Sequence, residues 1–310
     1  MSSNREILEK GAITSAGTLQ AEGAGGFLSP EQARKFISYM VDNSAIMKDI
    51  RVETMAAPEK QLDLMLIGSR LIRKATEATE PSELAGVNIR RKELRSVKVR
   101  LSADISTDFL EDNIEGTDAK ERIARELAMQ FSNDIADLFI NGDTAATGTD
   151  ASFLTIGDGI LKQAKTSSDT HKFDLTGKSD YSGVIFPGML ALMPNQFKRN
   201  KSDMRFYCSS NVSEAYIRSV ATRATDLGDD ALTTGRAVKY LGIQLFPVEY
   251  LPDDVIILTN KNNLVSGIQR AMKVYSQFNQ KKDETEYTMY MRVDPGKILW
   301  EDALVIGYKF

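Results

Sequence analysis

The sequence predicts an α+β protein made of several differently organised segments, and three features carry this prediction. Residues 51–105 contain alternating apolar and polar side chains on both sides of a polar tip, a pattern typical of a long β-hairpin. Residues 117–141 keep apolar side chains at helical spacing, and residues 183–260 alternate strand-like with helix-like runs. The 310 residues suffice for two domains or for one core with large insertions.

The first 30 residues are small, polar and rich in glycine. Such a composition cannot bury enough apolar surface to fold alone, so we expect an arm that is free or lies on a partner. Ser29 and Pro30 then favour a helix start, with serine as the N-cap and proline in the first turn, and this helix should end near Asn43.

The predicted hairpin has two arms with apolar residues at every second position. Leu62, Leu64 and Leu66 mark the first arm, and residues 97–103 alternate strictly in the second. A polar segment, residues 76–86, forms the tip. We expect the two runs to oppose each other in a hairpin too long and polar to lie in its own core.

A long helix should follow the hairpin. Thr117 and Asp118 favour its start, and Asn141 followed by Gly142 favours its end. At 1.5 Å per residue, its roughly 24 residues would form a rod of about 36 Å.

The sequence after the long helix predicts an α/β segment followed by C-terminal strands. The capping residue of its second helix should be Asn211, with Glu214 three positions later. Turns are expected at residues 281–283 and at 294–296, where proline and glycine occupy turn positions. The expected strands are 184–186, 205–208, 240–248, 255–258, 272–278, 287–293 and 298–308, with a helix over 187–196.

The rare residues leave little room for catalysis. The chain has one histidine, His171, in a polar stretch where we expect an exposed loop, and one cysteine, Cys208, in a strand where we expect a buried, inert thiol. No phosphate-binding glycine motif is present. Carboxylates at 143, 150 and 158 do not have the spacing of a known calcium loop. We therefore predict no catalytic, cofactor-binding or metal-binding residues, and a protein that is not an enzyme.

Net charge and hydropathy exclude further classes of protein. A net charge of −4 and a pI near 5.4 argue against a dedicated nucleic-acid binder. No apolar run approaches the roughly 18 residues of a membrane-spanning helix, and the N-terminus has no apolar signal segment. We expect a soluble protein of a reducing cytoplasm that does not bind membranes.

Two neighbouring segments carry opposite charge. Residues 68–100 contain nine basic and four acidic residues, whereas residues 108–126 contain seven acidic and three basic ones. Since a basic hairpin and an acidic helix in one chain favour pairing between copies, we predict a contact between copies of the chain. Its basic side would be Arg90, Arg91, Lys92 and Arg95, and its acidic side Glu111, Asp112, Glu115 and Asp118.

Two alternatives to this contact stay open. The segments could be unrelated solvated surfaces, or the hairpin could bind nucleic acid. The second alternative is weaker, because no aromatic residue that could stack on a base lies between Arg90 and Arg100.

The order of these elements, together with local sequence, resembles the major capsid proteins of tailed bacteriophages, which have the Hong Kong 97-like or Johnson fold. The similarity covers about residues 25–310. The segments that carry it are 25–31 (GGFLSPE), 192–200 (LMPNQFKRN), 205–210 (RFYCSS), 240–245 (YLGIQL), 255–260 (VIILTN) and 263–267 (NLVSG).

The resemblance implies a division into five segments. These are an N-terminal arm with its following helix (1–50), a β-hairpin called the E-loop (51–105), a peripheral domain with a long spine helix (106–182), an axial domain (183–260) and further peripheral strands (261–310).

The resemblance also implies a function. The chain would assemble with itself, as hexamers and pentamers, into the icosahedral head of a tailed phage, after synthesis in the cytoplasm of a bacterial host. Expected partners are a portal, scaffolding or decoration proteins, and double-stranded DNA that is enclosed without sequence-specific binding. The alternatives are an encapsulin-type compartment shell and a cytoplasmic α/β enzyme.

Overall fold

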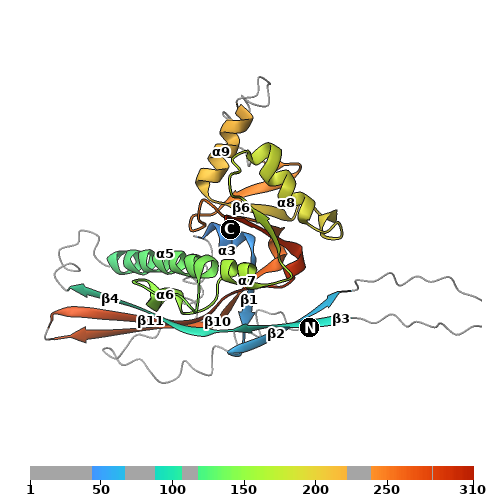
Figure 1. Ribbon diagram of the computed structural model, residues 1–310. Coiled ribbons are helices and arrows are strands. Elements are labelled where there is room, and N and C mark those ends of the chain that lie inside the picture. The colour runs from blue at the N-terminus through green and yellow to red at the C-terminus, as the bar shows by residue number, and fades with distance from the viewer. Residues whose placement is uncertain (1–43, 67–87, 107–117, 222–238, 281) are drawn as a thin grey trace, which may run out of the picture. The chain divides into compact units, whose positions relative to one another are not determined.

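The computed structural model describes residues 44–66, 88–106, 118–221, 239–280 and 282–310 (Figure 1). The expected arm, the helix expected to end near Asn43 and the hairpin tip lie outside these residues. The chain divides into two compact units. One comprises residues 1–45, 98–135 and 270–292, and the other comprises 46–97, 136–269 and 293–310.

A six-stranded mixed sheet organises the second unit, in the order β5-β12-β9-β6-β8-β7. Strand β9 is antiparallel to both neighbours, whereas β6 and β8 are parallel, as are β12 and β5. The strands are β5 (His171–Asp174), β6 (Met204–Cys208), β7 (Lys239–Tyr240), β8 (Ile243–Pro247), β9 (Ile256–Asn260) and β12 (Leu304–Tyr308).

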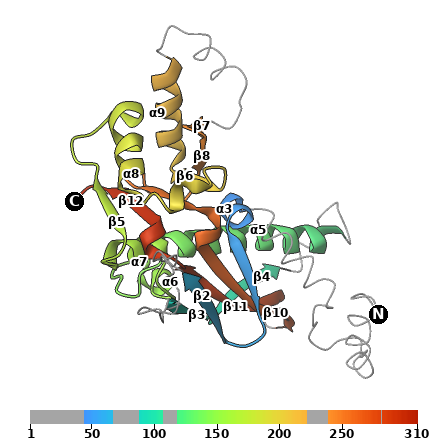
Figure 2. The same cartoon turned by 90° about the vertical axis from the view of Figure 1, so that its right-hand side faces the viewer.

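Two helices share one apolar core with this sheet, α8 (Phe186–Leu192) and α9 (Ser210–Ala221) (Figure 2). Phe186 of α8 and Phe206 of β6 are both fully buried, and their ring centroids are 4.7 Å apart. Burial of a phenylalanine side chain contributes about 1.5–3 kcal/mol, so these two rings help to hold α8 on the sheet.

The segment before α8 differs from the prediction. Residues Tyr181–Ile185 form a π-helical turn rather than the expected strand, and the helix after it ends at Leu192 instead of 196. The carboxylate of Asp180 accepts hydrogen bonds from the backbone N–H groups of Ser182 and Gly183, which satisfies the free donors of a helix start. A short 3₁₀ turn, Phe197–Arg199, follows.

The cap of α9 also lies elsewhere than predicted. The hydroxyl of Ser209 accepts a 3.3 Å hydrogen bond from the N–H of Val212, so Ser209 caps the helix. Asn211 instead donates to both carboxylate oxygens of Asp253, at 2.9 and 3.1 Å. The predicted capping role of Asn211 is therefore wrong.

The expected strand 240–248 is two strands joined by a tight turn. Leu241 and Gly242 connect β7 to β8, and both have positive φ, 49° and 87°. Positive φ at both central residues is typical of a type I′ hairpin turn, which favours Asn-Gly. A leucine in this conformation costs roughly 1–2 kcal/mol.

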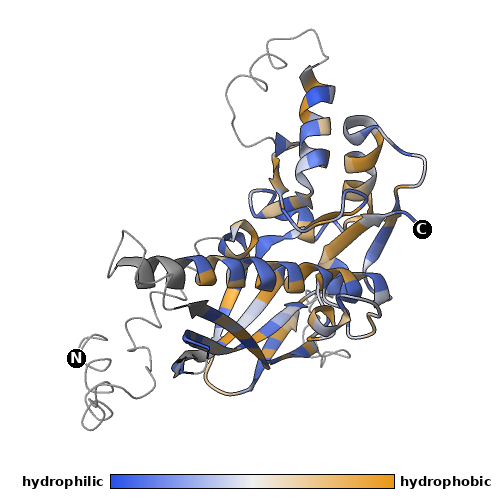
Figure 3. Cartoon of the chain, turned by 90° about the vertical axis from the view of Figure 1, so that its left-hand side faces the viewer, coloured by the Kyte–Doolittle hydropathy of each residue, from blue (hydrophilic) through white to orange (hydrophobic). Residues whose placement is uncertain are grey.

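The long helix is confirmed as α5 (Asp118–Asn141), with 24 residues. Figure 3 shows hydrophilic and hydrophobic residues alternating along it, and Phe131, Ile135 and Leu138 are buried. The helix stops at Gly142, where a Cβ atom would lie 2.3 Å from the carbonyl oxygen of Gly157. Only glycine fits this close approach. Shorter helices are α3 (Ala45–Asp49), α6 (Ala151–Leu154) and α7 (Ile160–Thr166).

A four-stranded sheet has the order β1-β10-β11-β4. Its strands are β1 (Arg51–Met55), β4 (Val97–Ser106), β10 (Leu264–Asn279) and β11 (Glu284–Ile298), and both β10 and β11 contribute residues to the two units. The predicted turn at 294–296 is wrong, because these residues lie within β11. The predicted last strand is interrupted by a 3₁₀ turn, Glu301–Ala303, before β12.

The hairpin is confirmed, with a different second strand. Strand β2 (Glu59–Leu66) pairs antiparallel with β3 (Asn88–Arg95), from Glu59 opposite Arg95 to Leu66 opposite Asn88. The run 97–103, expected as the opposing arm, belongs to β4 in the four-stranded sheet. Ser96 separates β3 from β4, and its hydroxyl oxygen lies 3.0 Å from the Pro58 carbonyl oxygen and 2.7 Å from Gln269 Oε1, within hydrogen-bond distance of both.

Candidate functional site

The β2–β3 hairpin has two chemically different faces. Directly opposed residues of an antiparallel pair point to the same side, and successive residues alternate. The inner face, defined by contacts to the rest of its unit, carries Lys60, Leu62, Leu64, Arg90, Lys92 and Leu94. The outer face carries Glu59, Gln61, Asp63, Met65, Ile89, Arg91, Glu93 and Arg95.

Apolar packing holds the base of the inner face. Leu94 is fully buried and contacts a cluster formed by Met55, Val265 and Leu299. Leu62, Leu64 and Trp300 pack partly buried around this cluster. The hairpin is therefore an integrated part of its unit at this end.

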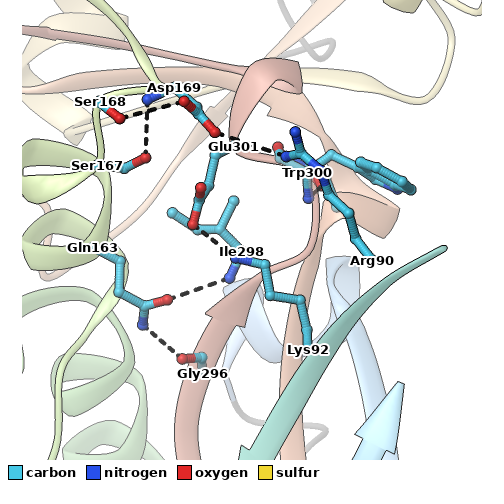
Figure 4. A network of polar contacts seen from close by, with 11 residues as sticks. Arg90, Lys92, Gln163, Ser167, Ser168, Asp169, Gly296, Ile298, Trp300 and Glu301 are labelled. Atoms are coloured by element: carbon cyan, nitrogen blue, oxygen red, sulfur yellow. Dashed lines mark hydrogen bonds and ion pairs between the residues drawn. The ribbon is translucent and has the colours of Figure 1, made fainter. Parts of the chain in front are cut away.

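Each basic side chain of the inner face meets a carboxylate of its own chain. Lys92 Nζ lies 2.8 Å from Glu301 Oε1, and Arg90 Nη1 lies 3.7 Å from Asp169 Oδ2 (Figure 4). Lys60 Nζ lies 2.6 Å from Glu53 Oε2, and this pair lowers the pKa of Glu53. The positive charge of the inner face is thus matched within one subunit.

A side chain from α7 fixes the strand that leads to Glu301. Gln163 donates through its amide nitrogen to the carbonyl of Gly296 at 2.8 Å and accepts through its oxygen from the N–H of Ile298 at 3.5 Å (Figure 4). Asn263 accepts from the N–H of Trp300 at 2.7 Å. These bonds place Glu301 beneath Lys92.

A buried carboxylate fixes the backbone at the hairpin base. Asp294 is 1% exposed and accepts hydrogen bonds from the N–H of Arg95 at 2.5 Å and of Gly296 at 2.7 Å. Burial raises the pKa of Asp294, although these two bonds and Lys297 act in the opposite direction. The sequence pattern places Asp294 in a turn and does not single it out as a buried acceptor.

The charged side chains of the outer face form ion pairs with one another and are open to solvent. Arg91 Nε lies 2.8 Å from Asp63 Oδ1, and this hydrogen bond raises the pKa of Arg91. Arg95 lies 3.0 Å from Glu93 and 3.8 Å from Glu59. Further along, Met65 and Ile89 oppose each other and are 65% and 61% exposed.

The structure divides the predicted basic group. Arg90 and Lys92 lie on the inner face, whereas Arg91 and Arg95 lie on the outer face. Period-two alternation along 88–95 would have revealed this split, which a count of charges ignores.

The predicted acidic group cannot be placed in the same way. Glu111, Asp112 and Glu115 lie outside the described residues, and Asp118 is the first residue of α5. The contact between the two groups therefore stays a prediction.

The histidine, the cysteine and two of the carboxylates considered for catalysis or calcium binding have structural partners or are buried in the fold. His171 lies at the start of β5, half-buried, and not in the exposed loop that we expected. Cys208 is fully buried, as predicted, and burial raises the pKa of its thiol to about 12, so it is not a nucleophile at neutral pH. Asp143 pairs with Lys162 at 3.0 Å, and Asp158 accepts from Thr144 at 2.8 and 2.9 Å.

Within the described ranges, no group of three or more histidine, cysteine or acidic side chains could hold a metal ion. Among the same residues, no helix is both long and apolar enough to cross a membrane.

Comparison with known proteins gives a consistent result. No protein-family model matches the chain. A protein of Bacillus subtilis (strain 168) named as a prophage capsid protein, YqbE, is 28% identical over 285 residues, which cover 87% of this chain and 88% of that protein.

Solved capsid structures also match the chain, at low sequence identity. A subunit of the satellite phage P4 procapsid that includes the size determination (Sid) protein matches with a TM-score of 0.67 and 14% identity, covering 100% of this chain and 98% of that one. The capsid of an empty GTA particle matches with a TM-score of 0.62 and 15% identity, covering 99% of both chains. The fold is the Hong Kong 97-like capsid fold, as predicted.

Proposed function

We infer that this chain, a member of the tailed-bacteriophage major capsid protein family, assembles as hexamers and pentamers into the icosahedral shell of a phage head. The observation that carries this inference is the match to the procapsid subunit, which covers 100% of this chain and 98% of that one. The prophage capsid relative, which this chain covers over 88% of its length, supports the same function.

A structural rather than enzymatic role fits the chemistry of the chain. The single thiol is buried and the single histidine is half-buried in a strand. The relatives named above are capsids, and no observation favours an encapsulin-type compartment over a phage shell.

The proposal extends to location and partners. The chain would reside in the virion head, assemble in the cytoplasm of the bacterial host, and meet a portal and scaffolding or decoration proteins. It would surround double-stranded DNA without reading its sequence, which suits a net charge of −4. The five segments predicted from the sequence serve as its working domain division.

The outer face of the E-loop is the surface we propose for contact with a neighbouring subunit. Arg91 and Arg95 are 58% and 69% exposed, so they can exchange their present partners for carboxylates of another copy. The predicted partners are Glu111, Asp112, Glu115 and Asp118. Arg90 and Lys92 would contribute indirectly, by holding the hairpin against its own subunit.

Negative-stain electron microscopy of the purified chain, across a range of concentration and salt, tests the proposed function. Closed shells, or rings of five or six subunits, are the expected result. A protein that remained monomeric under all conditions, including co-expression with candidate scaffolding proteins, would contradict the proposal.

A further inference from the structure

Residues 195–202, here called the α8–β6 turn, join helix α8 to strand β6 and carry a local excess of positive charge (Figure 1). They read NQFKRNKS, with three basic residues and no acidic one, in a chain whose net charge is −4. Arg199 and Lys201 are exposed, and Lys198 is half-buried. Within the part of the chain that the structure describes, none of these three side chains forms an ion pair or a hydrogen bond.

Two carboxylates beside the α8–β6 turn are matched by other cations. Asp203, directly after the turn, lies 4.0 Å from Lys261 Nζ. Asp49 lies 3.4 Å from Arg205 Nε and accepts a 2.9 Å hydrogen bond from the hydroxyl of Tyr207. One lysine and one arginine thus balance these two carboxylates, and the three positive charges of the turn remain.

The backbone of the turn is fixed before any ligand binds. Phe197 packs against the apolar core that α8 and α9 share with the six-stranded sheet, and its N–H donates to the carbonyl of Pro194 at 3.1 Å. At the other end, the guanidinium of Arg205 donates to the carbonyl of Ser202 at 2.6 Å. A ligand that binds here therefore orders side chains only, which lowers the entropic cost of binding.

The residue types of the turn suit the phosphate backbone of a nucleic acid. Double-stranded DNA carries one negative charge for about every 1.7 Å of its axis, so several phosphates lie within reach of three neighbouring cations. Stacking on bases would need an exposed aromatic side chain, but the aromatic residue of this turn, Phe197, packs into the core. The turn thus favours phosphate contacts, which carry no sequence information, over base recognition.

We propose that Lys198, Arg199 and Lys201 contact the phosphate backbone of the double-stranded DNA that the shell encloses, so that the α8–β6 turn lies on the inner surface of the shell. This contact rests on the proposed shell function and gives one of its partners a surface on the subunit. An acidic chain with this one basic turn would hold nearby DNA weakly and without regard to sequence.

Neutralising the three side chains together tests this contact. The variant Lys198→Gln, Arg199→Gln and Lys201→Gln should keep the circular dichroism spectrum of the wild type, because none of the three has a partner in the described part of the chain. Fluorescence anisotropy measures binding of the dissociated full-length chain to a labelled duplex of about 30 base pairs between 50 and 200 mM salt. Loss of three phosphate contacts should weaken binding at 50 mM salt at least about tenfold, and it should reduce the slope of log K against log salt by about 2.7.

A matched control removes the same charge elsewhere. Arg218→Gln, Lys282→Gln and Lys309→Gln also lower the net charge by three, from exposed positions on α9, between β10 and β11, and near the C-terminus. This variant should keep most of the wild-type affinity and salt dependence.

Three results of the duplex assay would overturn the proposal. Equal losses in the two triple variants would mean that only the total charge matters. Unchanged binding in the α8–β6 variant would mean that its side chains do not meet DNA. Binding of the wild type to phosphatidylglycerol vesicles but not to the duplex, lost in the α8–β6 variant, would make the turn a membrane-binding surface.

Assembled shells show on which side the turn lies. A circular plasmid is too large to enter a closed shell, so closed empty shells should not bind it through this turn, whereas dissociated chains should. Plasmid binding by closed wild-type shells that the α8–β6 variant loses would place the turn outside and overturn the proposal. A wild-type chain that forms no shell would instead contradict the proposed function, while the duplex assay would still decide whether the turn binds DNA.

Discussion

The two faces of the β2–β3 hairpin use the same residue types for different purposes. On the inner face, Lys92 and Arg90 reach carboxylates far along the chain, Glu301 and Asp169. On the outer face, Arg91 and Arg95 pair with carboxylates of the hairpin itself. Adjacent arginines thus differ in whether they bind the hairpin to its subunit or keep a solvent-facing surface nearly neutral.

This difference teaches that the net charge of a segment does not describe its surface. The outer face of the hairpin holds three acidic and two basic side chains among its described residues. The basic excess of the β2–β3 hairpin therefore lies on its inner face. A neighbour that docks on the outer face would meet exchangeable ion pairs and two exposed apolar residues, not a strongly positive surface.

The largest expected difference between the faces concerns apolar side chains. Leu94→Ala should lower the free energy of unfolding by about 2–5 kcal/mol, because Leu94 is fully buried. Ile89→Ala on the outer face should change it by less than about 0.5 kcal/mol. Urea denaturation followed by circular dichroism measures both, and equal losses would contradict the assignment of faces.

The buried carboxylate at the hairpin base should have the next largest effect. Asp294→Asn replaces an acceptor of two backbone N–H groups by an amide that offers one acceptor, so we expect a loss of roughly 1–3 kcal/mol.

The pH dependence of that loss has a definite sign. Because the folded-state pKa of Asp294 is raised, its contribution is largest at low pH and declines as pH rises through that pKa. The stability advantage of the wild type over Asp294→Asn should therefore shrink from pH 3 toward neutral pH. For Asp253→Asn the advantage should grow instead, because hydrogen bonds from Ser209 and Asn211 lower the pKa of Asp253. Parallel thermal melts across pH compare the two variants.

A smaller effect is expected from the inner ion pair. Lys92→Gln should reduce the free energy of unfolding by at most about 1 kcal/mol, and the reduction should weaken as salt rises. Arg91→Gln should leave it unchanged, since Arg91 and Asp63 are exposed. Hydrogen exchange of the β3 amides, measured at low and high salt, would show whether only the first variant loosens the hairpin.

Charge reversal on the outer face should have the smallest effect on subunit folding and a large effect on assembly. Arg91→Glu should leave the circular dichroism spectrum intact and inhibit shell formation, and Glu111→Lys with Glu115→Lys should partly restore it. Unimpaired shells from Arg91→Glu at low salt would remove the proposed contact and leave the outer face as a solvated surface.

Much of the fold could be predicted, because its longest elements have strong local patterns. Helix α5 has apolar spacing, a polar start and a glycine stop, and its observed bounds agree with the prediction within a residue. Predictions failed where a single polar side chain decides the geometry. Asp180 stabilises a helical turn in an apolar stretch that resembled a strand, and Asp294 lets β11 continue through a Pro-Gly pair that resembled a turn.

The candidate site was only partly accessible to sequence reasoning. The charge contrast could be read from composition, but strand register decides which arginine faces which side, and register depends on the pairing of 88–95 with 59–66. Residues 97–103, which alternate strictly, do form a strand, but this strand lies in the four-stranded sheet. Alternation identifies a strand without identifying the strand that it pairs with.

Trp300 has a practical consequence for experiments on this fold. It is the single tryptophan of the chain, and it packs against the cluster that also receives Leu94 of the hairpin. Its indole emission therefore comes entirely from the place where the β2–β3 hairpin joins the rest of its unit. A red shift of that emission would report water reaching this place, so intrinsic fluorescence can follow the lifting of the hairpin in the assembled protein without any attached dye.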